Sequence, residues 1–562
     1  MGKLIGRVLA TEKSPTTLDK FSFWTDANLK LHAFDIVKVE HLDESYTYGV
    51  IENVSHITDA QSYLTNFISS DFGNVDIDGP TIRVGMNFAE AKVSFNDRNL
   101  YTPVHNDARV YLADADEITQ ALGLGSIQNK LVCGSLRMYE GTDDKITLPV
   151  YLNSKFLLGP EGAHLNISGI SGLAAKTSYA MFLMKAIQDQ YIENRDEDES
   201  VAFVIFNVKG KDLMAIDKPN DFSFDDDPNA KEETYAEYAE LMLSTEPFQQ
   251  VKYYIPYTAS NTRKLNTYLS EEDIDNYINT GQLKKFKYLY DEDKENIEMM
   301  FSNIDDPNQT MESIISKIID QDDLDFRDVS TWVEFQDVLS EKSRKGTGGG
   351  KEDISVMSWR KFKRVIRKAL QDDMFATRAD HGKGECRLGD ELQTICANDV
   401  MVIDIAKLPE DKQAFVFGDA IRTIYNLKLG EFDTPTSQKP PARIIIFIDE
   451  LNKYASKDVP KSSPILHEIL DVTERGRSLG VVLFGAEQFR SAIHDRVTGN
   501  CATHAYGRTN SIETSTRDYG SLPATYKNML TRLEQGDYLI QNPVFRSLLK
   551  VSFPKPLYRQ FK

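Results

Sequence analysis

The sequence is poor in cysteine and contains no long apolar run. Its four cysteines form no C-x-x-C pair, so neither a disulfide framework nor a zinc site is expected. They are Cys133, Cys386, Cys396 and Cys501. No apolar run reaches about 18 residues, and the N-terminus lacks the apolar core of a signal peptide, so we expect no membrane span and no secretion. These absences together predict a cytoplasmic protein with reduced thiols.

Basic residues are also in deficit. Against 86 Asp and Glu residues the chain has only 65 Lys and Arg, which gives a net charge of −21. A protein that coats nucleic acid with its whole surface should be basic, so that class is excluded. A narrow basic channel inside an oligomer stays possible, because only the local patch meets the phosphates.

The stretch from Leu165 to Ile187 has the layout of a phosphate-binding loop. A short apolar run leads into a Gly/Ser turn, then into Lys176 and Thr177, and then into a helical pattern. In such a loop the backbone N–H groups and the helix N-terminus face an anion, the lysine supplies a point charge, and the hydroxyl reaches Mg²⁺. The residues predicted to bind ATP are Gly169, Ser171, Gly172, Ala174, Ala175, Lys176, Thr177 and Ser178.

The sequence of this loop departs from the usual pattern G-x-x-x-x-G-K-[ST]. Six residues instead of five separate Gly169 from Lys176, and Ala175 stands where a glycine normally precedes the lysine. Alanine in a backbone position that needs a positive φ costs on the order of 1 kcal/mol or more. We therefore expect the loop to take a different path, with ATP binding retained and the rate of turnover left open.

A buried strand that ends in two carboxylates is the strongest single signal. Apolar residues follow Arg443, and Asp449 and Glu450 come directly after them. Open α/β sheets place their ligands at the carboxyl ends of their strands. We predict that Asp449 and Thr177 hold Mg²⁺ and that Glu450 orients or polarises the attacking water. Such a run also occurs by chance, but the phosphate-loop pattern before it favours an ATPase.

Polar residues beside two further strands complete the predicted catalytic set, which also includes Lys176. Arg475 and Arg477 precede an apolar strand, where an arginine at a subunit boundary can reach the ATP of a neighbour. Gln488 follows that strand as a candidate sensor of the γ-phosphate, and Arg508 is a second candidate for action on a neighbour. The alternatives are a helix cap for the first two arginines, a polar strand end for Gln488 and a surface ion pair for Arg508.

Strand and helix patterns divide the chain into four parts of an α/β protein. Residues 1–150 show short alternating strands typical of a small β-barrel for assembly or partner docking. Residues 151–214 and 396–562 are predicted to form the two parts of the ATPase core, the second with the C-terminal tail. Residues 215–395 are predicted to be a mainly helical insertion, because no continuous apolar strand is obvious there.

Two basic segments lie within that insertion. The glycine-rich run from Ser343 to Asp353 resembles a second phosphate loop only superficially, because no strand precedes it and Glu352 stands where a hydroxyl is needed. A flexible loop is the simpler interpretation. The helix predicted from Ser358 to Leu370 is the most basic amphipathic one in the chain. It is either a solvated face over a core stripe or a face that meets phosphates.

The order of these features resembles the HerA-type ATPases of the HerA/FtsK branch of P-loop NTPases. The matching features are Ile5 to Val8, Leu158 to His164, the Asp449-Glu450 pair, Glu474 to Gly480 and the strand that carries Gln488. The resemblance implies a RecA-like core, an N-terminal barrel like a HAS-barrel, and a homohexameric ring. It also implies ATP-driven translocation of double-stranded DNA in a central channel, as in helicase-like motors.

The resemblance also implies an effector protein docked at the barrel face. In the family these partners are NurA-type nucleases or, in bacterial antiphage systems, sirtuin-like NAD-degrading proteins and other nucleases. The sequence from Gly169 to Ser178 is similar to that of the defence-associated members. The first hypothesis is therefore a hexameric DNA motor that drives or activates an effector in antiviral defence. The second is a nucleotide-dependent ring scaffold that activates a toxic effector with little or no translocation, and a weaker third is a protein unfoldase.

Overall fold

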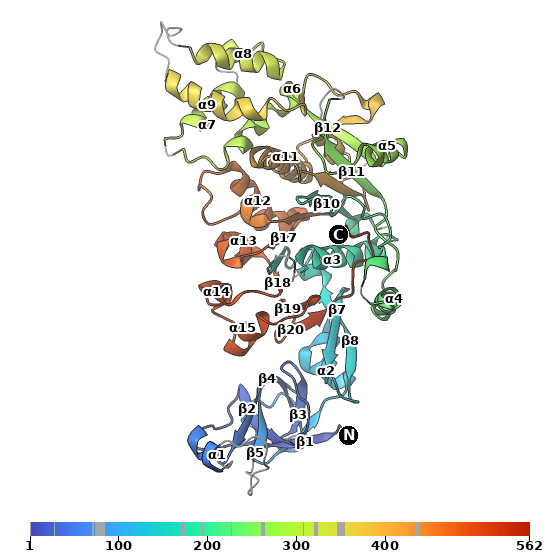
Figure 1. The fold of residues 1–562 in the computed structure, drawn as a ribbon, viewed down its shortest axis with the longest axis vertical. Coiled ribbons are helices and arrows are strands. Elements are labelled where there is room, and N and C mark those ends of the chain that lie inside the picture. The colour runs from blue at the N-terminus through green and yellow to red at the C-terminus, as the bar shows by residue number, and fades with distance from the viewer. Residues whose placement is uncertain are drawn as a thin grey trace.

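The computed structural model describes residues 2–26, 28–69, 72, 85–170, 172, 175–193, 196–225, 227–259, 265–306, 308–319, 324–344, 354–432 and 439–561. A β-barrel forms one end of an elongated molecule, a large sheet with its helices forms the middle, and helices α8 (Trp332–Lys342) and α9 (Val356–Ala369) lie at the opposite end (Figure 1). Within the described ranges, no helix has the length and apolarity that a membrane crossing needs.

The N-terminal strands close into a barrel in the order β1-β2-β5-β4-β3-β6. Their bounds are β1 Leu4–Leu9, β2 Lys20–Thr25, β3 Ile36–Glu40, β4 Tyr46–Thr58, β5 Gly85–Asn96 and β6 Arg109–Leu112. The predicted N-terminal barrel is thus confirmed, but it ends at Leu112 and not near residue 150. Because β6 pairs with both β1 and β3, the barrel has no open edge left for a later strand.

The hairpin of β7 (Lys130–Met138) and β8 (Ile146–Asn153) belongs to a second, 14-stranded sheet. The six consecutive strands β15-β10-β16-β17-β9-β18 of this sheet run parallel. Their bounds are β15 Val400–Asp404, β10 Val201–Asn207, β16 Arg443–Asp449, β17 Val481–Glu487, β9 Leu165–Ser168 and β18 Thr503–Tyr506. Strands β19 (Asp537–Gln541) and β20 (Leu549–Ser552) extend the sheet antiparallel towards β7. The α/β core is therefore confirmed.

The expectation of a mainly helical insertion at residues 215–395 is not confirmed. This stretch supplies four strands of the large sheet, β11 Val251–Pro256, β12 Leu283–Leu289, β13 Phe375–Ala376 and β14 Glu385–Arg387. Three lysines interrupt β12, so it has no apolar run. Lys287 is nevertheless buried, because its Nζ lies 2.6 Å from Glu385 Oε2 on the paired strand. Because the ion pair allows a lysine to be buried in a strand, β12 cannot be recognised from its hydrophobicity.

Helices surround these strands within the same stretch. They are α4 Ala230–Glu240, α5 Glu271–Asn279, α6 Tyr290–Asp293, α7 Thr310–Ile319, α8, α9 and α10 Leu388–Gln393. The remaining α-helices of the described residues are α1 Tyr63–Ser69, α2 Ala115–Leu122, α3 Lys176–Tyr191, α11 Glu410–Leu429, α12 Pro464–Leu479, α13 Asp495–Asn500, α14 Ser511–Thr514 and α15 Ala524–Leu530.

The central sheet is buried on both faces. Along β10, Val201, Phe203 and Ile205 face one apolar core, and the residues between them face another. Helix α3 packs in the first core, and helices α11 and α12 pack in the second. The continuous apolar run of β10 follows from this double burial.

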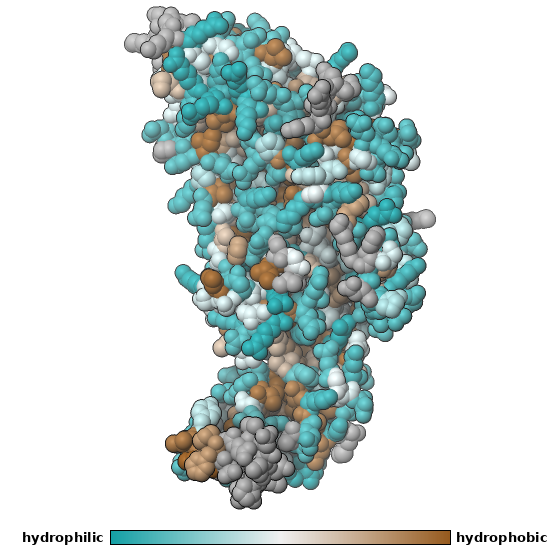
Figure 2. Space-filling view, in the orientation of Figure 1, coloured by the Kyte–Doolittle hydropathy of each residue, from teal (hydrophilic) through white to brown (hydrophobic). Residues whose placement is uncertain are grey.

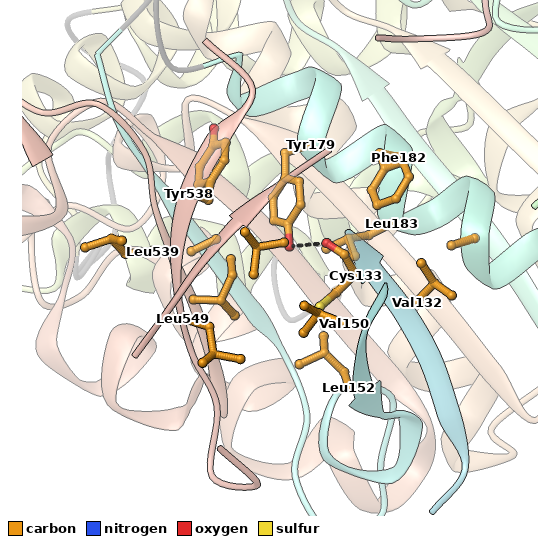
Figure 3. Close-up of a cluster of buried hydrophobic side chains, with 14 of the residues drawn as sticks. Val132, Cys133, Val150, Leu152, Tyr179, Phe182, Leu183, Tyr538, Leu539 and Leu549 are labelled. Carbon is orange, nitrogen blue, oxygen red and sulfur yellow. Dashed lines mark hydrogen bonds between the residues drawn. The ribbon is translucent and has the colours of Figure 1, made fainter. Parts of the chain in front are cut away.

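Aromatic contacts fix helix α3 to the antiparallel end of the sheet. The hydroxyl of Tyr179 donates to the carbonyl of Cys133 at 3.1 Å, as Figure 3 shows. Its ring stacks on that of Tyr538 with the ring centroids 4.6 Å apart. The buried apolar side chains of β7, β8, β19 and β20 surround this pair (Figure 3). The start of α3, where the phosphate loop ends, is therefore held by the core beneath it.

Candidate nucleotide-binding site

The phosphate loop connects β9 to α3 at the carboxyl edge of the sheet. All four residues of β9 are buried, and β9 lies between β17 and β18. The amide of Gly169 donates to the carbonyl of Glu487 at 3.1 Å, and that of Ile170 donates to the carbonyl of Arg508 at 2.8 Å. Gly169 and Gly172 both have a positive φ, +158° and +81°. The predicted residues Ser171 and Ala174 lie outside the described part of the chain.

Ala175 has the backbone conformation of the glycine that it replaces. Its φ of 46° and ψ of 39° are left-handed, and it stands directly before the first residue of α3. Whether the loop takes a different path stays a prediction, because residues 171, 173 and 174 lie outside the described part of the chain. The conformation costs alanine roughly 1–2 kcal/mol, and the packed helix that follows imposes it.

Lys176 and Thr177 meet the carboxylates of β16 at this edge. Lys176 is 5% exposed, and burial lowers the pKa of its amine below the ordinary value, against the opposing charge of Asp449. The Thr177 hydroxyl donates to Asp449 Oδ2 at 3.1 Å. A hydroxyl and a carboxylate oxygen are hard donors of the kind that Mg²⁺ prefers beside phosphates, so this pair fits the predicted metal.

Glu450 lies beside Asp449 and receives two hydrogen bonds. Gln488 donates from Nε2 to Glu450 Oε1 at 2.9 Å, and the ammonium of Lys209 donates to the same oxygen. Burial favours the neutral acid, but the two donors and the positive charges of Lys209 and Lys176 outweigh it and lower the pKa of Glu450. The carboxylate is therefore ionised at neutral pH, as a group that accepts a proton from water must be.

Backbone conformation separates the roles of the two carboxylates. Glu450 is the residue after β16 and has a left-handed φ of 59°. Such conformations occur where the surrounding structure determines them, and they are frequent at functional sites. Asp449 still belongs to the strand, and it points towards Thr177 on α3. The chain thus directs one carboxylate to the predicted metal and the other to Gln488.

Lys209 is a site residue that sequence reasoning missed. It follows β10 by two residues, and its Nζ also lies 3.8 Å from Asp449 Oδ2. Burial opposes the charged form of this lysine, but Asp449 and Glu450 outweigh that effect and raise its pKa. The usable signal was its position, because residues just beyond the carboxyl end of a buried parallel strand lie where such sheets bind ligands.

The C-terminal tail also lines the site. A pocket of about 420 Å³ contains Lys176, Thr177, Lys209 and Asp449 together with Tyr558, Gln560 and Phe561. The tail is held by backbone hydrogen bonds, from Asn220 N to Leu557 O at 2.7 Å and from Arg559 N to Lys218 O at 2.9 Å. The ammonium of Lys211 lies 4.5 Å from the centre of the Phe561 ring. In the sequence this segment showed only a basic end, with no sign of a site.

The predicted arginines lie outside this pocket. Arg475 and Arg477 are on α12, which continues to Leu479. Gly476 is not a helix stop. A side chain there would meet the carbonyl of Val481 at 2.7 Å, so close packing on β17 explains the glycine. Arg475 is exposed and pairs with Asp471 at 3.6 Å.

Arg477 and Arg508 have different surroundings. Arg477 donates from Nη1 to the carbonyl of Glu161 at 3.4 Å, on the loop before β9. Arg508 follows β18, and its carbonyl accepts from Ile170 in the phosphate loop. The structure thus brings Arg508 to the edge of the loop and leaves Arg475 and Arg477 on the surface of α12.

Glu487 is a second buried carboxyl group behind the site. It ends β17, directly before Gln488, and is 0% exposed. Burial raises its pKa from 4.5 to about 8, although the positive charge of Arg490 acts in the opposite direction. Arg490 itself donates to Asn166 Oδ1 at 2.6 Å, on β9. The group is therefore neutral at pH 7 in the folded chain.

Comparisons with known proteins show only remote likeness. No protein-family model and no curated protein matches the chain. Among solved structures, VirB4 of Thermoanaerobacter pseudethanolicus is 11% identical with a TM-score of 0.41, over 75% of this chain and 96% of VirB4. The bacterial conjugative coupling protein TrwBdeltaN70 is 11% identical with a TM-score of 0.39, over 74% of this chain and 90% of its own.

A third similar structure is the genome packaging NTPase B204 from Sulfolobus turreted icosahedral virus 2, in complex with ATP-gammaS. It is 15% identical with a TM-score of 0.21, over 29% of this chain and 71% of its own. Values this low support no statement about the function of this chain. The geometry of the site itself supports the proposals that follow.

The strain at Ala175 predicts the effect of restoring glycine. Ala175→Gly removes the left-handed penalty, and the more flexible unfolded chain offsets part of that gain, so the variant should be more stable by up to about 1 kcal/mol. Urea unfolding followed by circular dichroism measures the difference. Ala180→Gly in the middle of α3 is the matched control and should lose about 1 kcal/mol or more. If both variants lose the same free energy of unfolding, Ala175 is not strained.

The buried Glu487 predicts a pH dependence of stability. Because its folded pKa of about 8 lies above the ordinary 4.5, its stabilising contribution is complete below pH 4.5 and is lost as the pH rises through 8. The stability of the wild type, relative to Glu487→Gln, should therefore fall by more than about 1.4 kcal/mol over this range. Thermal and urea unfolding at several pH values test this. The exposed Glu161→Gln is the control, and a parallel pH profile for Glu487→Gln would refute the assignment.

Proposed function

We propose that this chain is an ATPase that works as a homohexameric ring and translocates double-stranded DNA. The observation that carries the ATPase part is the meeting of Lys176, Thr177, Asp449 and Glu450 at one edge of the sheet. Each part of a phosphoryl-transfer site is present there. A lysine can bind the phosphates, a hydroxyl and a carboxylate can bind Mg²⁺, and an ionised carboxylate can accept a proton from the attacking water.

The chain's own residues divide the work of hydrolysis. Lys176 and the N-terminus of α3 bind the phosphates, and Thr177 and Asp449 would hold Mg²⁺, which neutralises phosphate charge when bound. Glu450 orients the water and takes up its proton. Gln488 holds the Glu450 carboxylate in place, and Lys209 adds a second cation beside it. The tail residues Tyr558 to Phe561 cover the rest of the pocket.

A ring is supported by the position of the arginines. Arg475 and Arg477 lie on the surface of α12, outside the pocket of their own chain. There they can act on the ATP of a neighbouring subunit, as can Arg508 at the edge of the phosphate loop. The resemblance to HerA-type ATPases supports six subunits and DNA in the central channel, and the four cysteines without a C-x-x-C pair support a cytoplasmic location. A scaffold with little translocation is the alternative, and the strained loop at Ala175 favours the slow turnover that such a scaffold would need.

The barrel is the proposed docking face for an effector, a nuclease or a sirtuin-like NAD-degrading protein, in antiphage defence. Helix α1 and the residue after its loop expose five large apolar side chains, namely Tyr63, Leu64, Phe67, Ile68 and Phe72. Figure 2 shows apolar atoms gathered at this end of the molecule, over α1. Apolar patches of this kind are typical of protein interfaces.

ATP hydrolysis and its stimulation by DNA test the motor. Lys176→Ala should lose nucleotide binding, whereas Glu450→Gln should bind ATP and lose at least about 100-fold in hydrolysis, because only the water step is affected. The wild type should hydrolyse ATP faster with duplex DNA and displace a DNA-bound roadblock, and EDTA should abolish both activities. Lys155→Ala, an exposed lysine before β9, serves as the control. If DNA does not change the rate of ATP hydrolysis and no roadblock is displaced, the motor is refuted and the scaffold is the remaining proposal.

Substitutions on α1 test the docking face. Leu64→Asp with Phe67→Asp should remove the effector that co-purifies with the wild type from its native host, because charge replaces the apolar contact. ATP hydrolysis should stay within about twofold, since the helix is remote from the nucleotide site (Figure 1). Tyr101→Asp, also exposed on the barrel, is the control. An effector that remains bound to the double variant, or one fully active without this chain, would contradict docking and activation.

A further inference from the structure

A basic groove lies far from the nucleotide site, beside α9. It has a volume of about 740 Å³ and is lined by the end of α8 and one face of α9. Figure 1 places these helices at the end of the molecule opposite the barrel. Six lining residues are cationic, namely Arg344, Arg360, Lys363, Arg364, Arg367 and Lys368. The other lining residues are two serines and a glutamine, so the described part of the lining contains no acidic and no aromatic side chain.

The fold fixes the direction of this cationic face. On the opposite side of α9, Trp359, Phe362 and Ile366 are buried in the core. Phe362 stacks on Phe301 with the ring centroids 4.9 Å apart. Arg360 donates from Nε to the carbonyl of Ser343 at 2.9 Å, which ties α9 to the end of α8. The helix cannot rotate without exposing this apolar stripe, so the cations stay in the groove.

Four of the six cations of the groove have no ionic partner among the described residues. In a protein of net charge −21, Lys363, Arg364, Arg367 and Lys368 form no ion pair with any described residue. The nearest acidic residue in sequence, Asp372, is engaged elsewhere, 2.5 Å from Lys412 Nζ. Like charges one helical turn apart repel and destabilise a helix. A cluster of this kind is typical of a surface that meets a polyanion.

We propose that this groove binds the phosphate backbone of double-stranded nucleic acid without reading its sequence. The cations from Arg360 to Lys368 follow successive turns and span about 12 Å at 1.5 Å per residue. This is the length of three to four nucleotides of one strand at about 3.4 Å each. The groove has no aromatic side chain on which unpaired bases could stack, which favours a duplex over a single strand.

This site goes beyond the proposed ATPase function. It shares no lining residue with the nucleotide pocket, so it would hold a duplex without requiring ATP hydrolysis. Its position at the end opposite the barrel would keep DNA and the effector face apart (Figure 1).

Binding of a fluorescent duplex in the absence of nucleotide tests the site. Arg364→Ala/Arg367→Ala/Lys368→Ala should bind about 10-fold or more weakly at about 0.15 M salt, because three phosphate contacts are lost. The slope of log K against log salt should fall by about 3 for the same reason. ATP hydrolysis without DNA should be unchanged in this variant, so a failure of the groove is distinguishable from a failure of the ATPase.

A matched charge control and a second probe complete the experiment. Lys13→Ala/Lys20→Ala/Lys92→Ala removes three exposed lysines from the barrel and should leave duplex affinity within about twofold. Duplex should also protect Lys363 and Lys368 from acetylation in the unsubstituted protein, which needs no variant to fold. An equal loss of affinity in both triple variants, no protection of the two lysines, or tighter binding of polyglutamate or single-stranded DNA than of duplex would overturn the proposal.

Discussion

The hydrogen bond between Thr177 and Asp449 joins residues that are 272 positions apart in the chain. It exists because β9, β17 and β16 are parallel and in register, with Ser168 opposite Glu487 and Asp449 opposite Ala486. Strands paired in this way end at the same edge, so whatever follows them converges there. The phosphate loop, the two carboxylates and the amide of Gln488 all owe their position to this register.

Charge balance explains how so many ionisable groups share that edge. Asp449 and Glu450 are almost fully buried, and each lies within 4 Å of the ammonium of Lys209. Asp449 also accepts a hydrogen bond from the hydroxyl of Thr177. Burial favours the neutral form of a carboxyl group, and at Glu487 it outweighs the opposing charge of Arg490 and raises the pKa to about 8. Glu450 differs because Lys209 and Gln488 both donate hydrogen bonds to its carboxylate and lower its pKa.

The apolar strands and the residues at their ends could be predicted from the sequence, because double burial requires long apolar runs and polar residues then mark the edge. The runs before Asp449 and Gln488 are of this kind. Strand β12 could not be found in this way, since Lys287 is compensated by Glu385 on β14 and Lys284 by Glu391 on α10, both about 100 residues later. The end of the barrel, Lys209 and the C-terminal tail likewise depend on contacts between distant segments. The left-handed backbone of Ala175, which normally favours glycine, depends in the same way on the packed start of α3.

In the proposed function, Lys176, Thr177, Asp449 and Glu450 form one site for ATP and Mg²⁺. The most direct measurement is a structure of the full chain with Mg²⁺ and a non-hydrolysable ATP analogue. The phosphates are expected at Lys176 and the start of α3, and Thr177 and Asp449 are expected among the ligands of the metal. The γ-phosphate is expected on the side of Glu450 and Gln488. A nucleotide bound elsewhere, or phosphates that contact neither Lys176 nor the start of α3, would contradict the account.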